Sequence, residues 1–335
     1  MMNPALPATS GKRKHIFIAL VSAVVVSLAA NGIELIVIRL VRPSEQALTW
    51  VSDLVIAVVL AAAIYLRLDL QATRMRLSRV EQEQIVADTE LSLAAEIQSG
   101  RLPKAPSAGS GFSWAARLRQ ARKIGGDFYD FVQLSPTRWF VILGDVSGKG
   151  VPAALLVTSV QTLFRGLSQT TDDPAEVLRA LSKGIHDETR GSMFVTCVVC
   201  LFDLVGKTLT YANAGHPPGL IVNHSKATLL ESTGPPVGLF ATSSHKTVTI
   251  PLHEGDIGVL VTDGVSESIE TDGVCWCELA KAALADLERP TAEQVCDKLM
   301  KMAQDGQGPA GITDWEDDQT AVVFLVDDSV SRGAG

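Results

Sequence analysis

The sequence lacks the positive charge that a nucleic-acid-binding protein needs. Its 335 residues include 29 Lys or Arg and 37 Asp or Glu, which gives a formal net charge of −8 at pH 7. Zinc-finger and recognition-helix patterns are also missing, and a surface without basic patches gains little from a phosphate backbone. We therefore expect no nucleic-acid partner.

Cysteine is scarce as well. The five cysteines are an odd number and form no disulfide framework, which favours a reducing compartment. Cys197 and Cys200 lie in the apolar run 194–204, where a strand would point them to opposite faces, so we interpret both as core residues. Cys275 and Cys277 share a face but have no second ligand pair nearby, which argues against a structural metal there.

Long apolar runs, in contrast, are concentrated before Leu70. Hydrophobic residues make up 47% of the chain, and the mean hydropathy is +0.23. The runs 16–38 and 47–66 each approach the roughly 20 residues that span a bilayer. Basic residues flank the outer end of each run, so the sequence predicts a two-helix membrane anchor over 1–66, with both ends in the cytoplasm.

An alternative for the first run is a cleaved signal peptide, because Ser27-Leu28-Ala29 suits a peptidase. Cleavage would export the rest of the chain, which the cytoplasmic chemistry below disfavours. Asp53 weakens the second run, and Arg39 and Arg42 weaken an outward-facing link. The expected location is nonetheless the inner membrane, with a multi-pass anchor and a cytoplasmic catalytic domain.

Proline and glycine are absent from 68–97, within a predicted linker helix over 67–99. Apolar residues recur at two heptad positions, first Leu70, Leu77 and Leu91, then Val80, Ala87 and Ala94. This resembles a coiled-coil seam and predicts a homodimer, although Gln84 interrupts it and a solitary amphipathic helix is an equal alternative. The Pro-, Gly- and Ser-rich segment 100–111 then marks a domain boundary.

The remaining domain, 112–328, has the pattern of an antiparallel β core covered by helices. Short β-type runs follow one another, and helical patterns interrupt them in two pairs. The β-type runs are 112–118, 128–134, 138–143, 194–203, 208–212, 246–250, 257–261 and 320–326, and the helical patterns are 152–167, 175–189, 277–287 and 292–303.

Acidic residues stand at the ends of these β-type runs. Asp127, Asp145 and Asp263 each adjoin glycine, and Asp317 and Asp318 directly precede the last run. Each Asp-Gly taken alone is most simply a turn. Together, carboxylates at several strand ends can converge, and hard divalent ions such as Mg²⁺ or Mn²⁺ take oxygen ligands of this kind.

Five strings carry a family resemblance: GGDFYD at 125–130, GDVSGKG at 144–150, YANAGHPP at 211–218, TDGVSE at 262–267 and DDQT at 317–320. Their order resembles that of the SpoIIE/RsbU-type branch of PPM protein phosphatases, from about residue 96 to 328. The resemblance implies an αββα sandwich with a binuclear Mn²⁺ or Mg²⁺ centre at one end. It also implies a serine/threonine phosphatase that acts on a phosphorylated regulatory protein such as an anti-sigma-factor antagonist.

The resemblance further implies roles for individual residues. Asp127, Asp145, Asp263, Asp317 and the carbonyl group of Val146 would hold the metal pair, with Asp145 bridging. Among the other residues of the matching strings, Asp318 is expected to support the ligands. Lys149 would contact substrate phosphate or be a solvated lysine. Asn213 and His216 belong to a motif for which a structural role and proton transfer are both open.

Three hypotheses follow. The first is an active phosphatase in which two ions activate a water molecule for attack on phosphorus, without a covalent intermediate. The absence of an HCxxxxxR loop agrees with this, because it excludes thiol chemistry. The second is a membrane-tethered scaffold that uses the phosphatase fold only to bind a partner. The third is a nucleotide cyclase, suggested by GGDF at 125–128, which would leave the other four strings unexplained.

Overall fold

The computed structural model describes residues 27, 45–106, 111–223, 226–271, 273–306 and 317–327. The chain divides into two compact units, Met1–Gln84 and Ile85–Gly335. The first expected membrane span, 16–38, lies outside the described residues apart from Ser27.

Helix α2, Glu45–Gly100, runs for 56 residues without a break. Its first part contains the second expected span, 47–66, and large apolar side chains there are exposed, for example Trp50 at 77% and Leu54 at 63%. Within the described part of the chain this is the one helix long and apolar enough to cross a membrane. The described residues therefore contain the second expected span as a candidate, while the first lies outside them.

The second unit contains two five-stranded sheets in which neighbouring strands are antiparallel. The first sheet has the order β1-β10-β9-β6-β7, and the second has the order β2-β3-β4-β5-β8. The strands are β1 Phe112–Arg119, β2 Asp127–Ser135, β3 Arg138–Val146, β4 Val195–Asp203, β5 Thr208–Ala214, β6 Gly219–Asn223, β7 Lys226–Leu230, β8 Val248–Pro251, β9 Ile257–Val261 and β10 Gln319–Val326.

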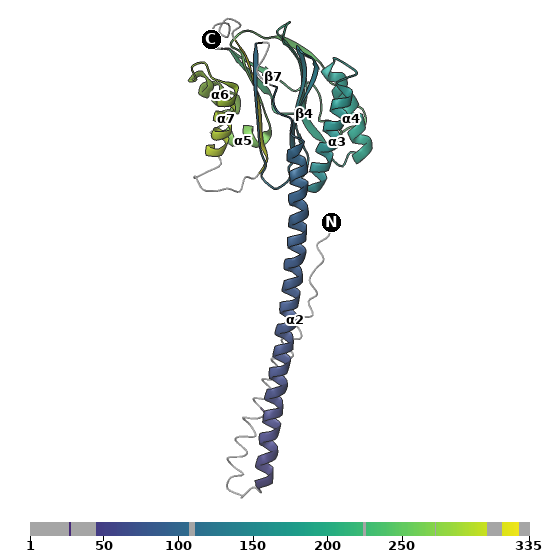
Figure 1. The fold of residues 1–335 in the computed structure, drawn as a ribbon, viewed down its shortest axis with the longest axis vertical. Coiled ribbons are helices and arrows are strands. Elements are labelled where there is room, and N and C mark those ends of the chain that lie inside the picture. The colour runs from purple at the N-terminus through teal and green to yellow at the C-terminus, as the bar shows by residue number, and fades with distance from the viewer. Residues whose placement is uncertain are drawn as a thin grey trace. The chain divides into compact units, whose positions relative to one another are not determined.

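Helices cover the outer face of each sheet (Figure 1). Helices α3, Val151–Leu167, and α4, Pro174–Thr189, share one apolar core with β2, β3, β4 and β5. On the opposite side, α5, Asp263–Ile269, α6, Trp276–Ala285, and α7, Ala292–Gly306, share another with β9 and β10. The result is the four-layer αββα sandwich that the sequence resemblance implied.

The alternation of apolar side chains in β10 fixes its place between two cores. Ala321 and Val323 face the core beneath α5, α6 and α7, whereas Val322 and Phe324 face the core between the sheets. Successive strand residues point to opposite faces, so an apolar residue at every position predicts a strand buried on both sides. Every residue of β10 is buried in the structure.

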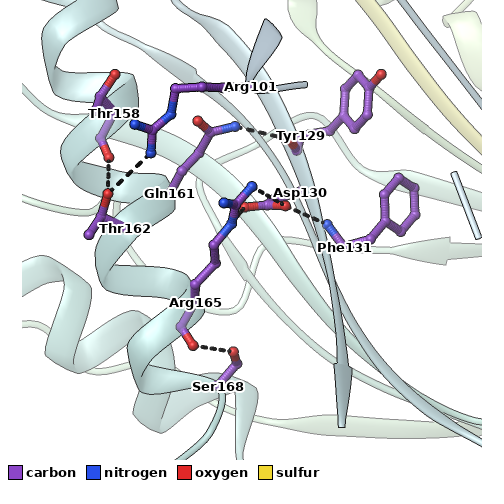
Figure 2. A network of polar contacts seen from close by, with 9 residues as sticks. All are labelled: Arg101, Tyr129, Asp130, Phe131, Thr158, Gln161, Thr162, Arg165 and Ser168. Carbon is purple, nitrogen blue, oxygen red and sulfur yellow. Dashed lines mark hydrogen bonds and ion pairs between the residues drawn. The ribbon is translucent and has the colours of Figure 1, made fainter. Parts of the chain in front are cut away.

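An ion pair between the partly exposed Arg165 and the buried Asp130 joins helix α3 to strand β2 (Figure 2). The Asp130 side chain is fully buried and accepts hydrogen bonds from Arg165 Nε at 2.6 Å and Nη2 at 3.2 Å. The backbone N–H of Phe131 donates to the same carboxylate. Burial raises the pKa of Asp130, and the Arg165 guanidinium partly offsets that rise. This contact secures the helix that begins beside the site described below.

Removing the guanidinium should therefore destabilise the fold. We expect Arg165→Ala to lower the free energy of unfolding by about 3 kcal/mol, because it leaves a buried carboxylate without its partner. In helix α4, Lys183 forms an exposed ion pair with Asp187, four residues further on. Lys183→Ala removes this pair and should lower the free energy of unfolding by about 0.5 kcal/mol or less. Denaturant unfolding followed by circular dichroism measures both, and equal losses would contradict the assignment.

Candidate metal centre

The strand ends bring the predicted acidic residues to one end of the sandwich. Asp127 of β2 and Asp145 of β3 are direct partners in the register of the second sheet. Asp263 begins α5 after β9, and Asp317 and Asp318 lie just before β10. Because β9 and β10 are neighbours in the first sheet, the two sheets contribute acids from both sides of their junction.

Two hydroxyl groups form hydrogen bonds across this junction between the sheets. Thr262 Oγ1 donates to Asp127 Oδ2 at 2.7 Å, and Thr320 Oγ1 donates to the same oxygen at 2.6 Å. The threonines belong to the first sheet and its connections, while Asp127 belongs to the second. Asp127 is only 3% exposed, so its carboxylate is held at the base of the site by neutral donors.

A pocket lies beside several of these acids. Acidic, basic, glycine and apolar residues line it together: Ala121, Arg122, Ile124, Gly125, Gly126, Asp145, Val146, Gly148, Lys149, Gly150, Asp317 and Asp318. It therefore contains three of the predicted acids, the predicted carbonyl residue and the predicted lysine. Lys149 Nζ lies 3.3 Å from Asp317 Oδ1, with both side chains about half exposed.

The two glycines before Asp127 are required by space. A Cβ atom on Gly126 would lie 2.9 Å from both Asp145 Oδ1 and the Val146 carbonyl oxygen. A Cβ atom on Gly125 would lie 2.0 Å from Asp318 Oδ2. The backbone at Gly126 thus approaches two oxygens that the resemblance implied as metal ligands, the backbone at Gly125 approaches the supporting residue Asp318, and a side chain at either position would displace them.

Asp318 holds the loop around these glycines. Its carboxylate accepts hydrogen bonds from the backbone N–H groups of Ala121 and Gly126, each at 2.8 Å, and of Asp127 at 3.4 Å. The predicted supporting role of Asp318 therefore has a structural form, in which one carboxylate fixes three backbone amides.

The acids raise one another's pKa values. Burial, followed by the charges of Asp263, Asp317 and Asp318, raises the pKa of Asp145 to about 7. Burial and then Asp145 raise the pKa of Asp127, against the lowering effect of the two threonine hydroxyls. Burial and then Asp317 raise the pKa of Asp263. Carboxylates that oppose one another's ionisation form a site that a divalent cation would stabilise.

The donor set fits hard cations. Carboxylate and carbonyl oxygens are the ligands that Mg²⁺ and Mn²⁺ prefer. Across the described residues, no three side chains of His, Cys, Asp or Glu are grouped closely enough to hold a metal ion by themselves. Mg²⁺ keeps several water ligands and needs only one or two carboxylates, so an open, oxygen-lined pocket suits it.

Asn213 lies near the end of strand β5 and His216 just after it, and both make hydrogen bonds at this edge of the second sheet. The Asn213 side chain bonds both the backbone N–H of His216, at 2.8 Å, and its carbonyl oxygen, at 3.1 Å. His216 Nδ1 lies 3.1 Å from the hydroxyl of Thr196, the residue opposite Asp145 in the register. Burial lowers the pKa of His216 to about 3, so the imidazole is neutral. These contacts favour a structural role over proton transfer.

Arg122 is a candidate that the sequence analysis did not single out. It lines the pocket together with Lys149 and is exposed. The sequence signal for Arg122 was its position three residues before Gly125, close to the predicted acids. A basic residue beside a cluster of acids can bind an anionic substrate. Thr262 and Thr320 were also missed, although both stand inside the matching strings.

The fold and this carboxylate site define the chain as a PPM phosphatase-type domain. The SiaA-PP2C domain of Pseudomonas aeruginosa shares the fold, with a TM-score of 0.63 and 19% identity over 73% of this chain and 98% of that one. The profile of the family described as Stage II sporulation protein E (SpoIIE) matches residues 135–327. The chain belongs to the SpoIIE family.

Two relatives from Bacillus subtilis (strain 168) are similar in sequence. Phosphoserine phosphatase RsbU is 28% identical over 218 residues, which cover 64% of this chain and 63% of RsbU. Phosphoserine phosphatase RsbP is 27% identical over 192 residues, which cover 56% of this chain and 47% of RsbP. The similarity thus spans about half to two thirds of each relative's length.

The raised carboxylate pKa values predict how stability depends on pH. An acid with a higher pKa in the folded state binds its proton more tightly there, so stability is lost as pH rises from about 4 through the folded value, near 7 for Asp145. We expect the metal-free protein to melt at a lower temperature at pH 7.5 than at pH 5.5. Asp145→Asn should flatten this dependence in differential scanning fluorimetry, and an unchanged slope would contradict the coupling.

Proposed function

We propose that this chain is a metal-dependent protein phosphatase that hydrolyses phosphoserine or phosphothreonine on a cytoplasmic regulatory protein. The observation that carries the proposal is the gathering of acids from both sheets at one end of the sandwich, where burial and then the charges of neighbouring acids raise their pKa values. Membership of the SpoIIE family and the similarity to two phosphoserine phosphatases support it.

Asp127, Asp145, Asp263, Asp317 and the carbonyl group of Val146 would hold a binuclear Mn²⁺ or Mg²⁺ centre. When bound, such ions lower the pKa of a shared water and neutralise the phosphoryl oxygens. The chain's own residues do the rest. Asp145 lies where acids from both sheets meet, and the threonine hydroxyls fix Asp127 beneath it.

Arg122 and Lys149 would orient the substrate. Both line the same pocket as Asp145 and Asp317, and a phosphate group carries the charge that an arginine or lysine attracts. Asp130 would take no part in the chemistry, because its carboxylate is buried against Arg165. The complete set of acids favours catalysis over a scaffold that only binds a partner.

The proposed setting is the inner membrane, with the phosphatase domain in the cytoplasm. The exposed apolar part of α2 supports one span, and a multi-pass anchor would require the run 16–38 as a second. The heptad pattern over 67–99 supports a homodimer through the linker helix. The names of RsbU and RsbP support a phosphoserine-bearing protein as substrate, for which we propose an anti-sigma-factor antagonist.

Activity should depend on the acids of both sheets. We expect Asp145→Asn and Asp263→Asn each to lower kcat/KM by roughly 100-fold or more, because metal ions contribute several kcal/mol to transition-state stabilisation. Phosphate release from an aryl phosphate and from a phosphoserine peptide, with Mn²⁺ and the full chain in detergent, measures this. Asp187→Asn is the matched control, since Asp187 lies on an exposed face of α4. Wild-type activity in either site variant would reject the proposal.

Substrate binding should depend on Arg122. We expect Arg122→Ala to raise KM about tenfold with a smaller change in kcat, because a hydrogen bond to a charged group contributes about 1.5–3 kcal/mol. Arg138→Ala, which removes an arginine paired with Asp172 on the surface, should leave both constants unchanged. A fall in kcat alone would instead assign Arg122 to the chemical step.

A further inference from the structure

The end of helix α2 contacts the glycine loop of the site directly. The Gln98 side chain donates from Nε2 to the Gly125 carbonyl oxygen at 2.9 Å and accepts from the Gly125 N–H at Oε1, at 3.3 Å. One carboxamide thus bonds both polar groups of a single backbone residue. Gln98 and Gly125 are separated by 27 positions in the sequence.

The loop is held from its other side by the site itself. Asp318 Oδ2 accepts the hydrogen bond from the Gly126 N–H at 2.8 Å, and Asp318 Oδ1 accepts that from Ala121. The backbone of Gly125 and Gly126 is therefore clamped between a neutral carboxamide and a carboxylate.

This loop adjoins two residues proposed to hold the metal ions, Asp145 and Val146. The Gly126 carbonyl oxygen accepts a hydrogen bond from the Val146 N–H at 3.2 Å. The space beside the Gly126 Cα is so limited that a Cβ would lie 2.9 Å from Asp145 Oδ1 and from the Val146 carbonyl oxygen. A shift of the Gly125–Gly126 backbone would consequently displace Asp145 and Val146.

A second contact ties α2 to the same loop. Lys123 pairs with the Asp88 carboxylate, and its Nζ donates to Ser92 Oγ at 3.0 Å. These groups are largely exposed, so the pair contributes little to stability. It does hold Lys123, two residues before Gly125, against the part of α2 that precedes Gln98.

We propose that Gln98 is a positioning residue, which holds Gly125–Gly126 so that Asp145 and the Val146 carbonyl lie where a metal ion can bind both. The proposal rests on the proposed function, since it concerns that metal centre. Glutamine fits the role because it supplies one donor and one acceptor to one backbone unit. A glutamate would keep the acceptor but place a charged oxygen against the Gly125 carbonyl.

The test compares Gln98→Ala and Gln98→Glu with Gln82→Ala, a control that removes an exposed glutamine from the same helix. The full chain in detergent is titrated with Mn²⁺ by calorimetry, and hydrogen exchange is measured at the amides of residues 121–126. We expect both Gln98 variants to weaken Mn²⁺ binding about tenfold, as substitution of groups that orient metal ligands commonly does. We also expect faster exchange at Gly125 and Gly126, with both readouts unchanged in the control.

Activity separates positioning from catalysis. At saturating Mn²⁺ we expect kcat of Gln98→Ala to approach that of the wild type, because the lost interaction acts only through ligand geometry. Wild-type Mn²⁺ affinity and exchange in Gln98→Ala would overturn the proposal. If the wild type binds Mn²⁺ but releases no phosphate, the proposed function fails, and the difference in affinity and exchange between the variants still decides the role of Gln98. Absence of Mn²⁺ binding in the wild type would overturn both.

Discussion

The clustering of carboxylates away from water is the constraint on which the rest of the phosphatase domain depends. Burial first, and the charges of neighbouring acids second, raise the pKa values of Asp127, Asp145 and Asp263, so each would be more stable alone and in water. The free energy that opposes this arrangement is offset elsewhere, by three apolar cores in four layers. The fold thus stabilises an electrostatically unfavourable end that gains stability when cations bind.

Neither sheet contains the site by itself. The second sheet brings Asp127 and Asp145 through one β-hairpin, and the first brings Asp263 and Asp317 through the paired ends of β9 and β10. The two hydroxyl contacts to Asp127 cross this junction and set the spacing of the layers where the acids meet. The packing of the two sheets therefore also determines the positions of the acids. The site lies at an end of the sandwich because strand ends from both sheets meet there.

The parts predicted from the sequence were those with local signals. Alternating apolar residues revealed most strands, and acids at strand ends indicated the site. Strands β6 and β7 and helix α5 were missed, because each is short and β7 is largely not buried. The contacts that position the acids were also beyond prediction, since Thr262 and Thr320 lie 135 and 193 residues from Asp127 in the sequence. Only the tertiary fold shows which of these distant residues are in contact, whereas the resemblance shows only that the motifs occur in the family's order.

The groups that hold the acids are mostly neutral. Threonine hydroxyls fix Asp127, backbone amides surround Asp318, and a carboxamide holds Gly125. Hydrogen bonds of this kind fix geometry without cancelling charge. The Lys149–Asp317 pair is about half exposed and therefore screened by solvent, so it neutralises little of the cluster. A site built with buried arginines would have satisfied its own carboxylates, whereas this one retains negative charge at fixed positions, and that charge is what attracts divalent cations.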